Sequence, residues 1–502
     1  MPATPHDDPN IPARGATSRF SGELWVISPR AKRTNGPRWE TWGTLASMGS
    51  LNPTNWNRLW LAEVASFLPR PGVAASYKVV ALLQLIGHST SALSLLTIAT
   101  MLFTKGLFVA AALPWAFAKT DKNGPDKDGK YWISGEGIEA AFIPYGASIT
   151  DLLIDDQYGI SRDIIAGYDN ATHYSIDKAH PHFGGVPGRY ANRIRNSTFE
   201  IDGKTYKVKP NDNPTPEAPD GADTLHGGPD GWDYRNFTVV AHTKSSITFS
   251  LVDPDGKEGF PGEVVSYVTY TLTGRDWDIK IVALATTKKT PIMLTSHTYW
   301  NLDGFSNNET NTVSNHTLHM PYSGQRVGVD NILIPTGDIL ANKKGSANDF
   351  WSEPKQIGDQ ANNKELKNNC GFNCTGYDNC YIVNRGGLGD YDWRTEGPVA
   401  SLSSSWSGIQ VDIYTDQDAF QFYSCTQQSG AVPLKKNQGL DGNPDFPRTI
   451  PRYGCVVMEV QDWIDGINHP EWHREKKQLF EPGGDPYVLQ ARYSFSLKGK
   501  SS

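Results

Sequence analysis

The stretch DWDIKIVAL, residues 276–284, alternates apolar and polar side chains along most of its length. Side chains of a β-strand point alternately to its two faces, so this period of two predicts a strand with one buried face. The same alternation recurs in SITFSL at 246–251 and in GIQVDIY at 408–414. The residues expected to point inward are Trp277, Ile279, Ile281, Ile247, Phe249, Leu251, Ile409, Val411 and Ile413.

The connections between such stretches are typical of tight turns. FEIDGKTYKV at 199–208 predicts a hairpin, because Asp202-Gly203 tolerates the positive φ of a two-residue turn. The motifs DPDG and GGPDG separate other runs, and the chain is rich in Gly and Pro. No 3.6-residue period is sustained after residue 131. Together these signals predict an all-β sandwich of many strands, forming one large domain over residues 130–498.

The formal net charge of the 502-residue chain is -7 at pH 7. A nucleic-acid-binding protein would show a basic face, so this class of function is excluded and no nucleic-acid partner is expected.

The first hundred residues lack any core-forming pattern and predict a non-globular extension over residues 1–100. Within it, the segment 79–103 carries no charge and is long enough to span a bilayer. Residues 101–118 then show a short basic start, an apolar stretch and an Ala-x-Ala site, which is the layout of a secretory signal peptide.

Two interpretations of this region compete. In the favoured one, translation starts at Met101 and the upstream residues come from an over-extended gene model. In the other, segment 79–103 is a signal-anchor, and only then is a membrane a partner; basic residues would hold its N-terminus in the cytoplasm, namely Arg30, Lys32, Arg33, Arg70 and Lys78. Both place everything after Lys119 outside the cytosol, and the favoured one predicts a secreted protein.

Two further features agree with secretion. N-glycosylation sequons place candidate glycans on Asn170, Asn196, Asn236, Asn308, Asn315 and Asn373. The five cysteines all follow residue 369, and their odd number leaves at least one thiol unpaired within the chain. The spacing CGFNCTGYDNC at 370–380 favours a stapled loop over a zinc site, because no matching Cys/His pair lies nearby.

Five polar stretches stand out against the apolar alternation: GRYANRI (188–194), TLHGGPDGWD (224–233), TSHTYWNLDG (295–304), TGYDNCYIV (375–383) and VVMEVQDWIDGINHP (456–470). In the last, Glu459 stands at the end of a strongly apolar strand. A carboxylate there is either paired or shifted in pKa, and both conditions are common at active sites. A buried structural ion pair is the alternative.

Together these stretches, with EAAFIPYGASITDLLIDD (139–156) and EPGGDPY (481–487), resemble the aldose 1-epimerase (galactose mutarotase) family from about Tyr131 to Leu497. The resemblance implies a large antiparallel β-sandwich of the galactose mutarotase-like supersandwich type. It also implies an open sugar-binding cleft, an isomerase activity that interconverts the α and β anomers of free hexoses, and a free monosaccharide as partner.

The family's functional residues carry over onto matching positions. Its catalytic base corresponds to Glu459 and its catalytic acid to His297. The substrate-binding positions correspond to Asn192, Arg193, His226, Asp378 and the aromatic residue Phe422. Two positions depart from the family pattern: Val460 stands where a proline is frequent, and Trp463 where phenylalanine is usual. Cys380 follows the Asp378 motif directly, so a disulfide is expected to brace that loop.

The implied chemistry needs a base and an acid that flank one sugar carbon, and no metal or organic cofactor. With glutamate acting ionised and histidine charged, the acidic limb of a bell-shaped pH profile is expected to report Glu459 and the basic limb His297, unless the two titrate as a coupled pair. The remaining histidines are expected to lie on the surface or in loops rather than to bind metal; they include the pairs His180/His182, His316/His319 and His469/His473.

Two other functions compete with the epimerase. A non-catalytic sugar-binding protein could retain the cleft on the same fold without turnover. A glycosidase would need Glu459 together with a second carboxylate, Asp378 or Asp465.

Overall fold

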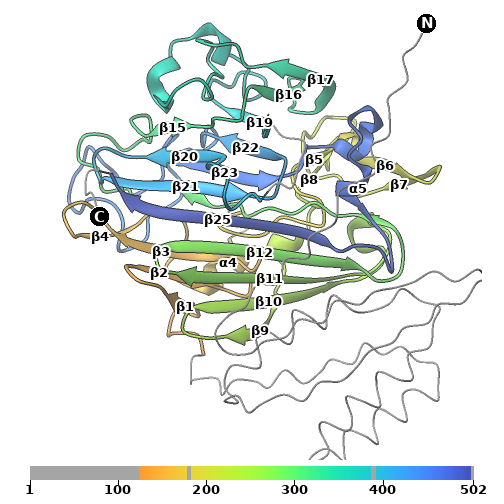
Figure 1. Cartoon of the computed structure of the whole chain (residues 1–502), viewed down its shortest axis with the longest axis horizontal. Helices are drawn as coiled ribbons and strands as arrows, with labels where there is room; N and C mark the ends of the chain where they lie inside the picture. Colours follow the sequence, from red (N-terminus) through yellow and green to blue (C-terminus); the bar gives the residue numbers. More distant parts are fainter. Residues whose placement is uncertain (1–123, 178–181, 386–391, 499–502) are drawn as a thin grey trace, which may run out of the picture. The chain divides into compact units, whose positions relative to one another are not determined.

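The computed structural model describes residues 124–177, 182–385 and 392–498 (Figure 1). The predictions for residues 1–100, for the apolar segment 79–103, for the signal peptide at 101–118 and for His180 lie outside the described residues. Among the residues that the structure does describe, no helix has the length and apolar character needed to cross a membrane.

Two large antiparallel sheets form the body of the molecule. The nine-stranded sheet has the order β18-β15-β20-β21-β25-β12-β11-β10-β9, and its long strands run side by side in Figure 1. In chain order these strands are β9 (Thr238–His242), β10 (Ser246–Asp253), β11 (Val264–Thr273), β12 (Asp276–Ala285), β15 (Thr317–His319), β18 (Lys355–Gln356), β20 (Ala400–Ser403), β21 (Ile409–Thr415) and β25 (Tyr487–Leu497).

The six-stranded sheet has the order β14-β23-β22-β19-β16-β17. Its strands are β14 (Tyr299–Trp300), β16 (Gln325–Val329), β17 (Pro335–Ala341), β19 (Asp378–Ile382), β22 (Ala419–Tyr423) and β23 (Val456–Gln461). This sheet carries several of the predicted site residues, so its two faces decide where the site can lie.

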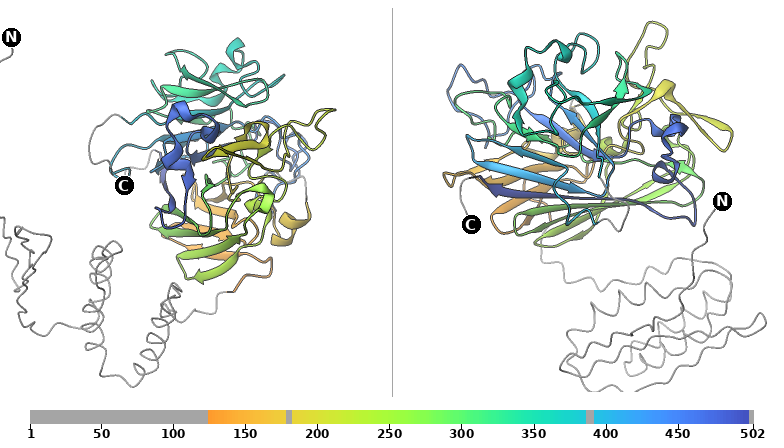
Figure 2. Two further views of the ribbon diagram at one scale, coloured as in Figure 1. Left: turned by 90° about the vertical axis from the view of Figure 1, so that its right-hand side faces the viewer. Right: turned by 45° about the horizontal axis from the view of Figure 1, so that its top comes forward.

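Smaller elements complete the described fold. A four-stranded sheet follows chain order through β1 (Tyr131–Ser134), β2 (Ile138–Phe142), β3 (Ile149–Asp155) and β4 (Ser161–Asp163), and Figure 2 shows it in orange beside the green strands β9 to β12. Three two-stranded ladders pair β5 (Arg193–Ile194) with β8 (Thr224–Leu225), β6 (Thr198–Ile201) with β7 (Lys204–Lys207), and β13 (Thr290–Pro291) with β24 (Leu479–Phe480). The α-helices are short: α4 (Ala171–Ile176) and α5 (Glu475–Gln478).

The strand alternation read from the sequence is confirmed. Along β12, Trp277, Ile279 and Ile281 are buried, and the equivalent residues of β10 and β21 are buried too. The hairpin of β6 and β7 also forms as expected, with Asp202 at φ 51° and Gly203 at φ 77° in its two-residue turn. The prediction of an all-β, antiparallel sandwich is therefore correct.

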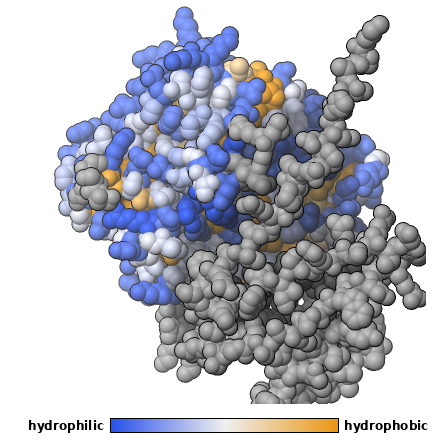
Figure 3. Space-filling model, viewed as in Figure 1, coloured by the Kyte–Doolittle hydropathy of each residue, from blue (hydrophilic) through white to orange (hydrophobic). Residues whose placement is uncertain are grey.

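One main core joins strands of the different sheets. The ring of Trp277 on β12 lies 5.0 Å from that of Tyr493 on β25, 6.1 Å from Trp300 on β14 and 6.4 Å from Phe142 on β2. Large buried aromatic rings contribute strongly to core stability because each removes a large apolar area from water. The face of the molecule in Figure 3 is mostly hydrophilic, in keeping with apolar side chains turned inward.

The cysteines form two disulfides, Cys370–Cys374 and Cys425–Cys455. The expected unpaired thiol is Cys380, which is buried. The prediction that a disulfide of Cys380 braces the Asp378 loop is therefore wrong. On β19 the Cys380 side chain packs in a small apolar cluster with Ile382 and Ala419, and the other four cysteines pair with one another.

This pairing predicts the thiol count. Burial raises the pKa of Cys380 to about 12, so the folded protein should not react with a thiol reagent that attacks the thiolate. Unfolding without a reductant should expose the single thiol of Cys380, and the Cys380→Ser variant should expose none. A colorimetric thiol titration in denaturant checks this. A larger thiol count would contradict the two disulfides.

Candidate active site

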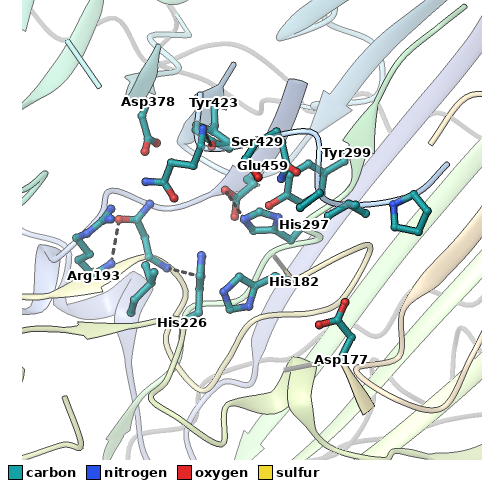
Figure 4. Close-up of a pocket in the computed structure, with 17 residues that line it drawn as sticks. Asp177, His182, Arg193, His226, His297, Tyr299, Asp378, Tyr423, Ser429 and Glu459 are labelled. Atoms are coloured by element: carbon teal, nitrogen blue, oxygen red, sulfur yellow. Dashed lines mark hydrogen bonds and ion pairs between the residues drawn. The ribbon is translucent and has the colours of Figure 1, made fainter. Parts of the chain in front are cut away.

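A cleft of 610 Å³ opens above the six-stranded sheet, and Figure 4 shows the side chains that line it. All of the catalytic and substrate-binding residues predicted from the sequence except Phe422 contribute to its lining. The lining also includes Asp177, His182, Tyr299, Tyr423 and most of the segment from Gln427 to Pro433. The predicted residues come from stretches that are far apart in the chain, so the fold itself assembles the cleft.

The alternation of β23 directs Glu459 into this cleft. Val456, Met458 and Val460 point into the main core, so Glu459 points to the opposite face. The sequence had suggested that Glu459 stands at the end of a strand, but it lies inside β23 (Val456–Gln461). Its side chain is only 3% exposed, and no Lys or Arg among the described residues lies within ion-pair distance of it. The alternative of a structural pair with a permanent cation is therefore not supported.

The same alternation explains why the prediction for Phe422 is wrong. On β22, Phe420 and Phe422 both point into the main core. The ring of Phe422 packs 5.4 Å from that of Tyr377 and 5.7 Å from that of Phe350. The next residue, Tyr423, points to the other face and lines the cleft.

His297 reaches Glu459 from an irregular segment. The strand-like composition of this stretch forms only the short β14, whose Tyr299 pairs with Val457 of β23. The backbone of His297 is held on both sides: its N–H donates to the Gly185 carbonyl at 2.9 Å, and its carbonyl accepts from Gly184 N–H at 2.9 Å. The result places His297 Nε2 3.6 Å from Glu459 Oε1.

Burial shifts both titrating groups toward their neutral forms. Desolvation raises the pKa of Glu459 well above its ordinary value, and the negative charge of Asp378 adds to this shift. Desolvation lowers the pKa of His297 well below its ordinary value, and a positive charge on His182 adds to it. Oε2 of Glu459 has no hydrogen-bond partner among the described residues, so it is free to accept a proton or hydrogen bond from a ligand.

A short ladder joins the GRYANRI and LHGG stretches. In the pairing of β5 with β8, Arg193 stands opposite Leu225. The next contact is reciprocal: His226 N–H donates to the Asn192 carbonyl at 3.0 Å, and Asn192 N–H donates to His226 Nδ1 at 3.1 Å. Because Nδ1 accepts, neutral His226 carries its proton on Nε2. The histidine can therefore donate a hydrogen bond to a ligand oxygen in the cleft.

The glycine after His226 is required by close packing. Gly227 has φ 86°, and a Cβ there would collide with the carbonyl oxygen of Gly188. Only glycine lets the two stretches approach closely enough for the His226 contacts to form.

Two further polar side chains are held by neighbours. Arg193 Nε donates to Asp212 Oδ2 at 2.7 Å, which fixes the guanidinium at the edge of the cleft. Asp378 Oδ1 accepts from Gln421 Nε2 at 2.6 Å, and Gln421 stands opposite Glu459 in the β22–β23 ladder. Ligand contacts made by Arg193 and Asp378 would thus need little reordering of either side chain.

His182 was expected to be an ordinary surface or loop histidine; it does lie in a loop, but that loop places it in the cleft lining. Its Nδ1 is hydrogen-bonded to the buried carboxylate of Asp233. Its ring centroid lies 4.7 Å from that of His226 and 5.5 Å from that of His297. The sequence signal that could have found His182 is its motif HPHFGG (180–185), which stands just before GRYANRI (188–194) in the chain.

The comparisons with known proteins agree with this geometry. The family model for aldose 1-epimerase matches residues 130–485. The chain belongs to the aldose 1-epimerase family.

Individual relatives extend this assignment. A probable aldose 1-epimerase of Arthroderma benhamiae is 42% identical over 392 residues, covering 73% of this chain and 86% of the relative. The galactose mutarotase of Bos taurus is 31% identical over 368 residues, covering 73% of this chain and 94% of the relative. The crystal structure of the GalM/aldose epimerase homologue of C. elegans superimposes with a TM-score of 0.60 at 27% identity, covering 74% of this chain and 99% of that one.

The two departures from the aldose 1-epimerase pattern lie outside the cleft lining. Val460 points into the main core. Trp463 packs edge-on against Trp472 at 5.5 Å, with the Arg474 guanidinium 5.2 Å from its ring. Neither residue lines the cleft.

The structure also shows the surroundings of Asp465, His316 and His469, which the sequence analysis named as alternative polar groups. Asp465 accepts hydrogen bonds from Arg195 N–H and Asn468 Nδ2 and does not line the cleft. His316 Nε2 accepts from Leu302 N–H, and His469 Nδ1 is paired with Glu471. Among the residues described, no group of three or more His, Cys, Asp or Glu side chains is placed to hold a metal ion.

Proposed function

We propose that this chain is an aldose 1-epimerase that interconverts the α and β anomers of free hexoses, with glucose and galactose as substrates. The family assignment supports an isomerase acting on free sugars. The observation that carries the proposal is the 3.6 Å approach of His297 Nε2 to Glu459 Oε1 in a cleft large enough for a hexose.

In the proposed mechanism, Glu459 and His297 move protons at the two oxygens that are bonded to the anomeric carbon. Glu459 removes the proton of the anomeric hydroxyl, and His297 donates a proton to the ring oxygen as the bond between that oxygen and C1 breaks. The open aldehyde rotates about its C1–C2 bond. Ring closure on the other face returns both protons, so the reaction is balanced without another reactant.

The remaining cleft residues are proposed to hold the sugar. Arg193 and His226 are placed to donate to hydroxyl oxygens, Asn192 offers an amide, and Asp378 offers an acceptor. A buried hydrogen bond to a charged group is typically worth about 1.5–3 kcal/mol, so each of these contacts can matter to affinity. Tyr299 and Tyr423 supply aromatic walls in place of Phe422.

The competing functions are less well supported. A binding protein without turnover would be expected to lack one of the two proton-handling groups, and both are present and adjacent. A glycosidase that pairs Glu459 with Asp465 is not supported, because Asp465 lies outside the cleft lining.

We also propose that the mature protein is a secreted glycoprotein. All six sequon asparagines are exposed, which glycan attachment requires: Asn170, Asn196, Asn236, Asn308, Asn315 and Asn373. The two disulfides suit an oxidising compartment.

The proton relay predicts large and non-additive losses. Glu459→Gln and His297→Asn should each lower kcat by about 10²–10⁴-fold, because each removes one general acid or base. The double variant should lose less than the product of the two single losses, because both groups act in one event. Polarimetry of freshly dissolved α-D-glucose and α-D-galactose measures this. If Glu459→Gln keeps the wild-type rate, the proposed mechanism is wrong.

The pKa shifts change the expected pH dependence. Burial favours the uncharged pair, in which Glu459 holds the one proton and His297 is neutral. Transfer of this proton from Glu459 to His297 generates the ionised base and the charged acid that the mechanism needs. On acidification His297 takes up a second proton below its ordinary range, and on alkalinisation Glu459 loses its proton above its ordinary range. The acidic limb of the pH profile is therefore set by His297 and the basic limb by Glu459, the reverse of the assignment made from the sequence.

We therefore predict a broad bell for kcat/KM with an acidic limb set by His297. The groups that face His297 are Glu459, His182, His226 and the ring of Tyr299. His182→Gln removes a positive charge that lowers the pKa of His297, so the acidic limb should move to higher pH. The control His242→Gln lies outside the cleft and should leave the limb in place. An unmoved acidic limb in His182→Gln would refute this electrostatic role.

Processing yields a separate prediction. Secreted protein should begin near Lys119 and should lose apparent mass on enzymatic removal of N-glycans. Sequencing of its N-terminus is the deciding measurement. Intact residues from before Met101 in the secreted form would contradict a start at that methionine.

A further inference from the structure

One wall of the cleft is formed by a loop rather than a strand. The loop, residues 424–455, connects β22 to β23, and the disulfide Cys425–Cys455 closes its base. We call residues 427–433 the cleft wall, because they contribute a group of lining side chains: Gln427, Gln428, Ser429, Ala431, Val432 and Pro433. The shape of the cleft therefore depends on where this loop is held.

Contacts at the cleft wall itself hold it only in part. Gly430 N–H donates to the Ile450 carbonyl at 3.0 Å, and Ile450 N–H donates to the Val432 carbonyl at 2.9 Å. Both bonds lie within the loop, so they set its shape rather than its position on the fold. Val432 and Leu434 pack against a neighbouring apolar cluster, but both stay partly exposed.

Buried polar side chains attach the loop behind the cleft wall. Among residues 427–440, all of which the structure describes, the buried residues are Gln428, Lys435 and Gln438. Lys435 is 1% exposed, and its Nζ lies 2.7 Å from Asp163 Oδ2 and 3.3 Å from Asp151 Oδ1. These carboxylates belong to β4 and β3, so Lys435 attaches the loop to the four-stranded sheet.

The cluster around Lys435 is balanced in charge. A second buried lysine, Lys130, lies 2.6 Å from Asp151 Oδ2, so two lysines face two carboxylates. Removing one member of a buried ion pair leaves an uncompensated charge and is strongly destabilising. Of the two lysines, Lys435 belongs to the loop and Lys130 does not. Gln438 Nε2 strengthens the same attachment by donating to two backbone carbonyls of the segment 163–165, at 2.9 Å and 2.7 Å.

We infer that Lys435 is a positioning residue for the epimerase: by attaching the loop to β3 and β4, it holds the cleft wall where it contacts a bound sugar. This inference rests on the proposed function, because it assumes a sugar in the cleft. Lys435 does not itself line the cleft, so it acts through the cleft wall. Glu459 and His297 lie outside the loop, so the inference concerns sugar binding rather than proton transfer.

Loss of this attachment is expected to change KM and to leave kcat in place. Without the Lys435 ammonium, only a fraction of the molecules would keep the cleft wall in position, and the apparent affinity for the sugar falls in proportion to that fraction. If the fraction is about one tenth, KM rises about tenfold. A saturating sugar selects the molecules with a complete cleft, so kcat stays near the wild-type value.

The test compares Lys435→Met with Lys130→Met, which removes the same charge from the same cluster but lies outside the loop. Polarimetry of fresh α-D-glucose should give an about tenfold higher KM and an unchanged kcat in Lys435→Met, and wild-type values in Lys130→Met. An unchanged KM in Lys435→Met, or an equal rise in Lys130→Met, would overturn the inference. Gln438→Leu keeps all four charges and should raise KM by a smaller factor. If Lys435→Met does not fold, Gln438→Leu decides, and an unchanged KM there overturns the inference.

Limited proteolysis with trypsin separates this inference from the proposed function. The exposed Lys436 is a cleavage site beside the attachment point, and it remains in Lys435→Met. Because cleavage needs a locally released loop, cutting after Lys436 should be about tenfold faster in Lys435→Met than in wild type or Lys130→Met. If wild type turns over no sugar, the epimerase proposal fails, while this faster cleavage still supports the role of Lys435 in holding the cleft wall. Equal cleavage rates in all three proteins would overturn that role.

Discussion

The site depends on the approach of one carboxyl group to one imidazole in a nearly dry cleft. Glu459 Oε1 and His297 Nε2 are 3.6 Å apart, and both side chains are almost fully buried. In water each group would ionise independently near its ordinary pKa. Here desolvation opposes charge on both, so the pair holds one proton that either group can carry. A reaction that removes a proton from one sugar oxygen and delivers one to another needs this shared proton.

The sheets make this approach possible. Alternation along β23 and β22 sends Met458 and Phe422 into the core and leaves Glu459 and Tyr423 facing the cleft. The pairing of Tyr299 with Val457 then fixes His297 two residues earlier, and hydrogen bonds to Gly184 and Gly185 hold its backbone. The strands thus position the carboxylates of Glu459 and Asp378, while irregular segments supply the imidazoles of His226 and His297. His182 belongs to this second class, because its pairing with Asp233 puts a further histidine against the reactive one.

Strand alternation and the quoted motifs were enough to predict the fold and six of the residues that line the cleft, but not Tyr423, His182 or the lining residues between Gln427 and Pro433. The errors at Phe422 and Cys380 share one physical origin, since sequence spacing does not specify which face of a strand points to the cleft. Phe422 and Tyr423 are adjacent aromatic residues, and only the register of β22 against β23 separates core from cleft. The free thiol of Cys380 follows the same logic on β19. His182 was missed because its contact with Asp233 spans 51 residues, and only its position just before GRYANRI points to the cleft.

Exchange spectroscopy by NMR tests the central claim most directly, because it follows both anomers at equilibrium without a pure starting anomer. With the purified protein, the account predicts exchange cross-peaks between the α and β H1 signals of glucose or galactose. It predicts none for a methyl glycoside, whose anomeric oxygen carries no proton for Glu459 to remove. Exchange no faster than in buffer alone, for either free sugar, would contradict the account.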